Sequence, residues 1–199
     1  VLLGDARIDQ AIVRVAEAGY DILPANADLT AAEVQLVTRI GREKQLSLAL
    51  ETVANNYDYI FIDCPPSLNM LTVNALVAAT GVVIPMQCEY YALEGLSSLL
   101  DTIDQIRINV NPHIKLEGLL RTMYDPRNNL ANDVSAELIQ HFGDRVYRTV
   151  IPRNIRLAEA PSYGQPIMQY DRNSRGSMAY IALAGEVLRR DAKQSHYPG

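Results

Sequence analysis

The sequence YIFIDCPPS, residues 59–67, is a short apolar run that ends in a carboxylate, two prolines and a hydroxyl. Such a run is typical of a strand buried in a parallel sheet, and we expect this strand to cover residues 57–63. It would deliver Asp63 to the carboxyl end of the sheet, where α/β proteins bind their ligands. An aspartate at a strand end can also serve as a helix cap, so the run alone leaves both interpretations open.

The rest of the chain alternates apolar runs with helical patterns. Further strands are predicted at residues 20–24, 81–86, 115–123 and 147–151. Helices are predicted at about 30–40, 43–55, 67–79, 92–107, 130–142 and 176–190. Thr30 and Glu33 match a capping box, and Met178, Ile181, Ala184 and Leu188 share one face of the last helix. We therefore expect one α/β domain over residues 1–199, with a mostly parallel sheet flanked by helices.

The composition is that of a soluble globular protein. The 199 residues are 48% hydrophobic and 21% charged, and no apolar run is long enough for a transmembrane helix. Two cysteines, Cys64 and Cys88, make no disulfide framework and suit a reducing compartment. The net charge of -5 argues against bulk attraction to nucleic acid. A local basic patch stays possible, because eight arginines gather between residues 121 and 175.

A nucleotide hydrolase that uses a strand-end aspartate also needs a phosphate-binding loop. That loop is rich in glycine and ends in Gly-Lys-Ser or Gly-Lys-Thr, so that backbone N–H groups and the lysine neutralise the phosphates. None of the 11 glycines in this chain is followed by lysine. The 199 residues therefore contain no such loop.

Four longer motifs resemble the ParA/Soj family of chromosome- and plasmid-partition ATPases. They are YDYIFIDCPPSLNMLTVNAL (57–76), PMQCEYYALEGLSSLLDTI (85–103), TMYDPRNNL (122–130) and VIPRNIRLAEAPSYGQPI (150–167). The resemblance implies a P-loop NTPase-like fold whose loop, strand and first helix precede these motifs. We therefore expect the domain to be incomplete at its N-terminus. The full-length protein is then expected to be an ATPase, and the 199 residues alone to be inactive.

The resemblance also implies roles for individual residues. Asp63 matches the Walker B aspartate, which acts on magnesium through water, and Pro65, Pro66 and Ser67 match the switch segment that senses the terminal phosphate. The residues that match segments bordering the nucleotide are Met123, Tyr124, Pro152 and Arg153. Arg127 and Arg156 match the basic positions that bind DNA without sequence preference. Without the resemblance, Met123 would equally be a packed strand residue and the arginines solvated surface groups.

The function that the resemblance implies uses ATP and Mg²⁺. ATP would drive formation of a homodimer that binds nonspecific DNA, and a ParB-type centromere-binding protein would stimulate hydrolysis. The expected location is the cytoplasm, in association with the nucleoid. Cys64 and Cys88 suggest an iron–sulfur cluster between subunits only weakly, because both lie within the partition motifs.

Two other functions stay open. One is a truncated, catalytically inactive interaction module. The other is a MinD-like positioning ATPase on membranes, which would end in a basic amphipathic helix with bulky apolar residues. The end of this chain, LRRDAKQSHYPG, is short and polar instead, so we expect no membrane partner.

Overall fold

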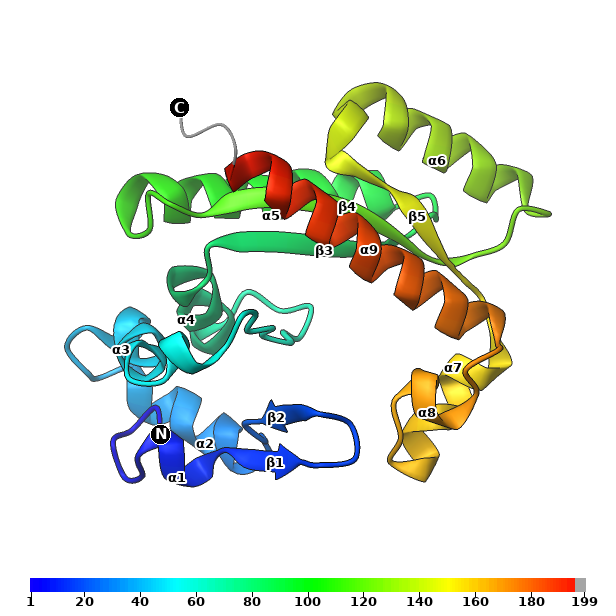
Figure 1. Ribbon diagram of the computed structural model, residues 1–199. Coiled ribbons are helices and arrows are strands. Elements are labelled where there is room, and N and C mark those ends of the chain that lie inside the picture. Colours follow the sequence, from blue (N-terminus) through cyan, green and yellow to red (C-terminus); the bar gives the residue numbers. More distant parts are fainter. Residues whose placement is uncertain (196–199) are drawn as a thin grey trace. The chain divides into compact units, whose positions relative to one another are not determined.

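The α/β pattern is present in a computed structural model of the chain, which describes residues 1–195 (Figure 1). Residues 196–199 lie outside the described residues. They belong to the polar segment LRRDAKQSHYPG, from which no membrane partner is expected. The described chain forms two units. Unit 1 comprises Val1–Val82 and Leu100–Lys115, and unit 2 comprises Val83–Leu99 and the residues from Leu116 onward. The expectation of one domain stays a prediction, and each unit is described by itself.

The central feature of unit 2 is a three-stranded sheet. Its strands are β3 (Gly81–Gln87), β4 (Lys115–Tyr124) and β5 (Val146–Pro152), in the order β3-β4-β5. β4 and β5 are parallel, with Leu119 opposite Val146 and Tyr124 opposite Pro152. Helices α6 (Asn129–Phe142) and α9 (Arg175–Ser195) accompany the strands, and the first part of α5 (Ala92–Asn109), up to Leu99, also belongs to unit 2. The expected class, α/β with a parallel sheet flanked by helices, is confirmed.

Helix α6 begins at Asn129 because the side chain of Asn128 caps its first turn. The Asn128 side chain accepts hydrogen bonds from the backbone N–H groups of Leu130 and Ala131, which would otherwise lack partners at the helix start. Val134 and Leu138 are buried on one face of the helix. Gly143 ends it with a φ of 51°, a conformation that glycine adopts without strain.

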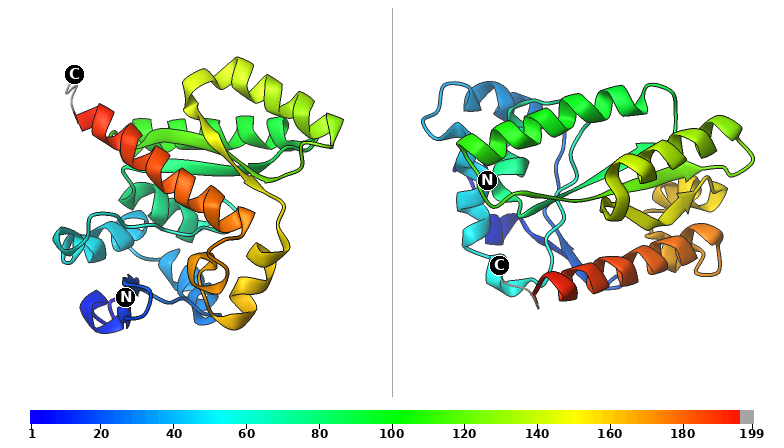
Figure 2. Two further views of the ribbon diagram at one scale, coloured as in Figure 1. Left: turned by 45° about the vertical axis from the view of Figure 1, so that its right-hand side comes forward. Right: turned by 90° about the horizontal axis from the view of Figure 1, so that it is seen from above.

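Helix α9 runs alongside the strands of unit 2 (Figure 2). Ala179, Leu183 and Val187 contact a buried cluster in β4 and β5 that is formed by Leu120, Tyr147 and Ile151. The face shared by Met178, Ile181 and Leu188 points to solvent instead, and Met178 is 62% exposed. The apolar stripe read from the sequence is therefore not the packing face of this helix.

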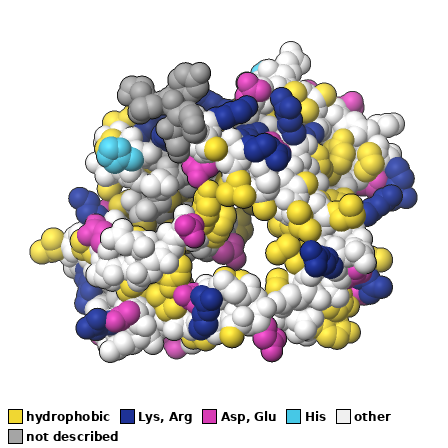
Figure 3. All heavy atoms as spheres, viewed as in Figure 1, with side chains coloured by type: hydrophobic (Ala, Val, Ile, Leu, Met, Phe, Trp, Pro, Cys, Tyr) yellow, Lys and Arg dark blue, Asp and Glu magenta, His cyan; other side chains and the backbone are white. Residues whose placement is uncertain are grey.

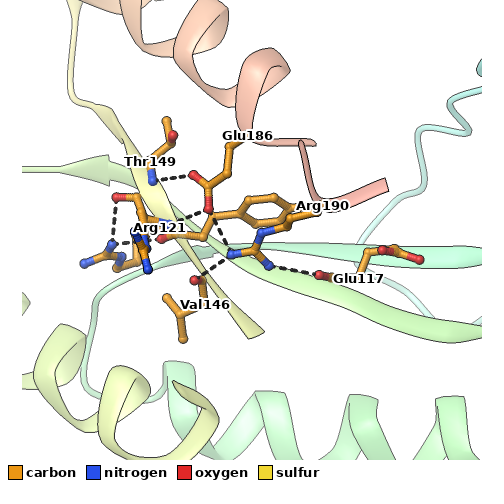
Figure 4. Close-up of polar contacts among 8 residues, drawn as sticks. Glu117, Arg121, Val146, Thr149, Glu186 and Arg190 are labelled. Atoms are coloured by element: carbon orange, nitrogen blue, oxygen red, sulfur yellow. Dashed lines mark hydrogen bonds and ion pairs between the residues drawn. The ribbon is translucent and has the colours of Figure 1, made fainter. Parts of the chain in front are cut away.

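Two charged side chains of α9, Glu186 and Arg190, fasten the helix to the strands, and we call this pair the α9 clamp (Figure 4). Glu186 accepts hydrogen bonds from the backbone N–H groups of Arg148 at 2.9 Å and Thr149 at 2.8 Å. β5 is an edge strand, and edge N–H groups need such partners. The clamp therefore supplies an acceptor to two backbone N–H groups of β5, where the strand register is irregular.

Arg190 completes the clamp from the next turn of the helix. Its guanidinium donates to Glu186 and to the backbone oxygen of Val146, both at 2.9 Å. A third hydrogen bond reaches the backbone oxygen of Glu117 at 3.3 Å, and the guanidinium carbon lies 4.0 Å from the centre of the Tyr147 ring. Burial alone would raise the pKa of Glu186, but the backbone N–H groups of Thr149 and Arg148, together with Arg190, lower it to about 2.

Unit 1 contains a two-stranded antiparallel hairpin and several short helices. The hairpin pairs β1 (Val13–Val15) with β2 (Tyr20–Ile22). The helices are α1 (Ile8–Ala11), α2 (Asp28–Leu36), α3 (Gln45–Glu51) and α4 (Met70–Ala78), with 3-10 turns η1 (Arg42–Lys44) and η2 (Ala54–Asn56). The fully buried Asn74 joins α4 to α3, since its side chain accepts from Leu46 N–H at 3.1 Å and donates to the Arg42 oxygen at 2.8 Å.

The expected capping box at Thr30 is wrong. α2 begins at Asp28, and its N-cap residue Ala27 has no side chain able to cap it. The Asn26 side chain accepts the Asp28 N–H at 3.0 Å instead. Glu33 accepts a hydrogen bond from the Asn69 side chain at 3.2 Å, which joins α2 to the start of α4.

The strand expected at residues 57–63 is also wrong. The structure assigns no strand there, and Phe61 is 81% exposed. A strand exists only where a neighbouring strand accepts its backbone hydrogen bonds. Within residues 1–195 the two sheets are β1-β2 and β3-β4-β5, and neither contains this segment. An apolar run predicts the tendency to form a strand but does not supply the partner.

No helix among residues 1–195 is both long enough and apolar enough to cross a membrane.

Candidate functional site

The carboxyl ends of β4 and β5 bring together three of the predicted nucleotide residues in unit 2. Tyr124 lies opposite Pro152 in the strand register, and the Arg153 N–H donates to the Tyr124 oxygen at 3.2 Å. Parallel strands end at the same edge of a sheet, so residues 28 positions apart in sequence become neighbours. Two separate motifs therefore form one continuous edge of unit 2.

Met123 has an unusual backbone at this edge. Its φ is 49°, and it is the only residue other than glycine with a positive φ among those described. The register shifts between Arg121 and Tyr124, as it does where a strand bulges, and bulges often re-aim side chains beside functional sites. Met123 as a whole residue is 43% exposed, so part of it is available for contact.

Hydrogen bonds order the turn that follows β4. The Tyr124 hydroxyl donates to the Asn132 side-chain oxygen. The amide nitrogen of Asn132 donates in turn to the backbone oxygen of Pro126 at 3.0 Å. Because Asn132 lies in the first turn of α6, these bonds tie the strand end and the turn to that helix.

Arg127, one of the two expected DNA contacts, is held by a neighbouring carboxylate. Its Nε donates to Asp125 Oδ1 at 2.9 Å and its Nη2 donates to Oδ2 at 2.7 Å. Asp125 Oδ1 also accepts the Arg127 backbone N–H at 3.0 Å. The Arg127 side chain is 88% exposed, and its hydrogen bonds hold the pKa of Asp125 at about 2.

Arg156, the other expected DNA contact, belongs to a larger cluster. It lies in α7 (Ile155–Glu159), which Asn154 caps by accepting the Leu157 N–H at 3.3 Å. The guanidinium contacts Glu159 at 2.9 Å and Asp171 at 3.4 Å. Its hydrogen bond lowers the pKa of Glu159.

Aromatic residues complete the Arg156 cluster. The Tyr170 hydroxyl of α8 (Ile167–Tyr170) donates to Glu159 at 3.1 Å. Tyr170 stacks on Tyr163 of the 3-10 turn η4 (Ala160–Tyr163), with ring centres 4.9 Å apart. Basic, acidic and apolar side chains are intermixed over α7 and α8 (Figure 3). Arg156 therefore also contributes to the contact between α7 and α8, through Glu159.

The third group of predicted residues lies in unit 1. Asp63, Pro65, Pro66 and Ser67 are exposed in the irregular segment before α4. Thr72 Oγ1 donates to the Ser67 backbone oxygen at 2.7 Å, and Asn69 caps α4 by accepting the Thr72 N–H at 3.0 Å. The end of the segment is thus anchored to the helix, and the fixed φ angles of the two prolines restrict the rest.

Asp63 has the chemistry that a magnesium site uses. Its carboxylate is exposed and forms no ion pair with any other described residue, and Mg²⁺ prefers carboxylate and water oxygens. The 199 residues offer no Gly-Lys-Ser or Gly-Lys-Thr sequence to cradle phosphates. They fit the carboxylate part of a magnesium–nucleotide site and not the phosphate-binding part.

Sequence reasoning missed Asp125, Glu159 and Asp171, the carboxylates that hold the two arginines. Asp125 lies two residues before Arg127 and Glu159 three residues after Arg156. These spacings allow ion pairs in a turn and along a helix. Asp171 lies 15 residues beyond Arg156, and only the fold brings it close.

Comparison with known proteins gives a consistent result. Residues 1–116 match the family model described as an AAA domain. The chain is 52% identical over 187 residues to the sporulation initiation inhibitor protein Soj of Bacillus subtilis, covering 94% of this chain and 74% of that protein. It is 48% identical over 193 residues to the chromosome partitioning protein ParA of Caulobacter vibrioides, covering 96% and 72%.

A solved structure supports the fold. The cobyrinic acid a,c-diamide synthase of Mycobacterium smegmatis, with bound ADP and magnesium, superimposes with a TM-score of 0.79 at 39% identity. The match covers 95% of this chain and 69% of that one.

Proposed function

Because the chain belongs to the ParA/Soj family of partition ATPases, we propose that its complete gene product binds ATP with Mg²⁺ and partitions DNA. ATP binding drives a homodimer that holds DNA without sequence preference. A ParB-type centromere-binding protein stimulates hydrolysis and release, and the protein works in the cytoplasm on the nucleoid. The observation that carries this proposal is the shared edge formed by Tyr124, Pro152 and Arg153, with an exposed arginine a few residues beyond each strand.

The chemical roles follow from the side chains. Asp63 holds the water shell of magnesium, and the bound ion offsets charge on the phosphates. Pro65, Pro66 and Ser67 form a stiff segment next to it that senses the terminal phosphate. Met123, Tyr124, Pro152 and Arg153 border the nucleotide. Catalysis of this kind depends mainly on positioning and charge, so each residue contributes through its location.

These 199 residues alone are expected to bind Mg-ATP weakly and not to hydrolyse it. They carry the carboxylate Asp63 but no glycine followed by lysine, so the phosphates lack their main positive partner. Isothermal titration of Mg-ATP into the chain should give no micromolar binding. The same titration with the complete gene product is the control. Micromolar binding by the 199 residues would overturn this proposal.

For DNA, we expect Arg127→Ala with Arg156→Ala in the complete gene product to weaken binding about tenfold to all sequences alike. The slope of log affinity against log salt should also become less steep by up to about two, because two fewer phosphates are neutralised. Fluorescence anisotropy of labelled duplexes with Mg-ATP present measures both quantities. Arg145→Ala with Arg189→Ala removes the same charge from other exposed positions of unit 2. An equal loss in both double variants would contradict the assignment.

A MinD-like role on membranes is the alternative. Liposome co-sedimentation that depends on ATP, together with no retention of DNA, would favour it over DNA partitioning. A truncated, inactive interaction module is the other alternative, and ATP hydrolysis by the complete gene product would exclude it.

A further inference from the structure

The two arginines assigned to DNA are already occupied by carboxylates of their own unit. Asp125 holds both the Nε and the Nη2 of Arg127, at 2.9 and 2.7 Å. Glu159 and Asp171 hold Arg156, at 2.9 and 3.4 Å. A DNA phosphate is an acceptor of the same kind, so it must displace a carboxylate before either guanidinium can use its full hydrogen-bonding fork.

The ion pair of Arg127 is easier to replace with a DNA phosphate than the ion pairs of Arg156. Arg127 is 88% exposed and has one acidic partner, which lies two residues away in a turn. Arg156 has two acidic partners, and one of them also accepts a hydrogen bond from Tyr170 of the neighbouring helix. Asp125 can release the guanidinium and still accept the Arg127 backbone N–H, whereas displacing Glu159 would disturb the contact between α7 and α8.

We propose that Asp125 is a built-in competitor for DNA phosphate that weakens the DNA contact of Arg127 and makes it readily reversible. Two effects act together: the carboxylate occupies the guanidinium, and its negative charge repels the approaching backbone. An exposed ion pair is weak enough for DNA to break. Asp125 therefore lowers the affinity without abolishing binding, as a protein that must release DNA repeatedly requires. This inference rests on the proposed DNA-binding function of Arg127.

The side chain of Asp125 has a second task that the test must preserve. Its Oδ1 accepts the Arg127 backbone N–H at 3.0 Å, which stabilises the turn. Asparagine keeps an acceptor oxygen at this place and removes the charge. Asp125→Asn therefore separates competition for the guanidinium from the shape of the turn.

The test measures DNA affinity of the complete gene product with Mg-ATP, by anisotropy of a labelled duplex at several salt concentrations. Asp125→Asn is expected to bind about twofold to fivefold more tightly. The slope of log affinity against log salt should become steeper by up to about one, because Arg127 then neutralises a phosphate without releasing a carboxylate.

A matched control separates competition from net charge. Asp144 in η3 (Gly143–Arg145) is exposed and lies beyond the opposite end of α6 from Asp125. That helix is about 20 Å long, well beyond the screening distance of about 8 Å in physiological salt. Asp144→Asn makes the same change in net charge and should leave affinity nearly unchanged. Equal tightening by both variants, or no tightening by Asp125→Asn, would overturn the inference.

A double variant distinguishes this inference from the function on which it rests. In an Arg127→Ala background, Asp125→Asn should give a smaller gain, because it then relieves only the repulsion of the DNA backbone and no guanidinium is left to release. If Arg127→Ala alone leaves DNA binding unchanged, the proposed role of Arg127 fails. If Arg127→Ala weakens binding but Asp125→Asn tightens it equally with and without Arg127, only the competition fails.

Discussion

We expect Glu186→Ala to lower the free energy of unfolding by about 3–5 kcal/mol, the usual cost of breaking a buried ion pair from one side. The substitution leaves the half-buried Arg190 without its carboxylate and the N–H groups of Arg148 and Thr149 without their acceptor. Urea unfolding followed by far-UV circular dichroism measures the change. Glu137→Ala, at an exposed position of α6, should change stability by less than about 0.5 kcal/mol.

The pH dependence gives a second readout of the α9 clamp. The pKa of Glu186 is about 2 in the folded protein, below its ordinary value of 4.5. A depressed carboxyl pKa contributes stability that is fully present above the ordinary value and is lost as pH falls towards 2. That contribution is about 3 kcal/mol. The difference in stability between the unmodified protein and Glu186→Ala should therefore shrink between about pH 4.5 and pH 2. A difference that stays constant would contradict this account of the clamp.

The second large effect is expected for Gly118→Ala, which should lower the free energy of unfolding by about 2–3 kcal/mol through overpacking. A Cβ atom at this position of β4 would lie 2.7 Å from the Tyr147 ring and 2.8 Å from the Arg145 backbone oxygen. Tyr147 is buried and carries Arg190 against its ring, so neither neighbour can move freely.

Gly95→Ala is the matched control for Gly118→Ala. Gly95 lies in α5, and a Cβ atom there would meet no atom within 4 Å. Alanine favours a helix over glycine by about 0.5–1 kcal/mol, so this variant should be as stable as the unmodified protein or slightly more so. Equal destabilisation by both variants would show that the close approach at Gly118 is not the cause.

The sequence predicted the elements of unit 2 well, because their signals are local. β4, β5 and α6 lie within one or two residues of the expected ranges. Asn128, which caps α6, and Gly143, which ends it, were not selected from the sequence, although both residue types are common at those places. The shared edge of Tyr124, Pro152 and Arg153 followed from the parallel arrangement of the strands. The family was recognised from four motifs, and the relatives confirm it.

The errors arose where structure depends on a partner distant in sequence. Residues 57–63 are as apolar as β5, yet no strand of the described chain lies beside them, and they stay irregular. The apolar face shared by Met178, Ile181 and Leu188 is not the packing face of α9, for a related reason. Its polar residues Glu186 and Arg190 face the sheet because an edge strand needs hydrogen-bond partners, a requirement that hydrophobic periodicity does not include. The carboxylates around Arg156 likewise depend on the folded positions of α7 and α8.

The positive φ of Met123 limits which side chains this position accepts without strain. Glycine adopts that conformation without strain, and asparagine and aspartate tolerate it better than most residues. Methionine holds it at a cost on the order of 1 kcal/mol. Variants selected for stability alone should therefore drift towards glycine, asparagine or aspartate at position 123. Selection that also retained partitioning would keep the thioether if the proposed contact of Met123 with the nucleotide outweighs that cost.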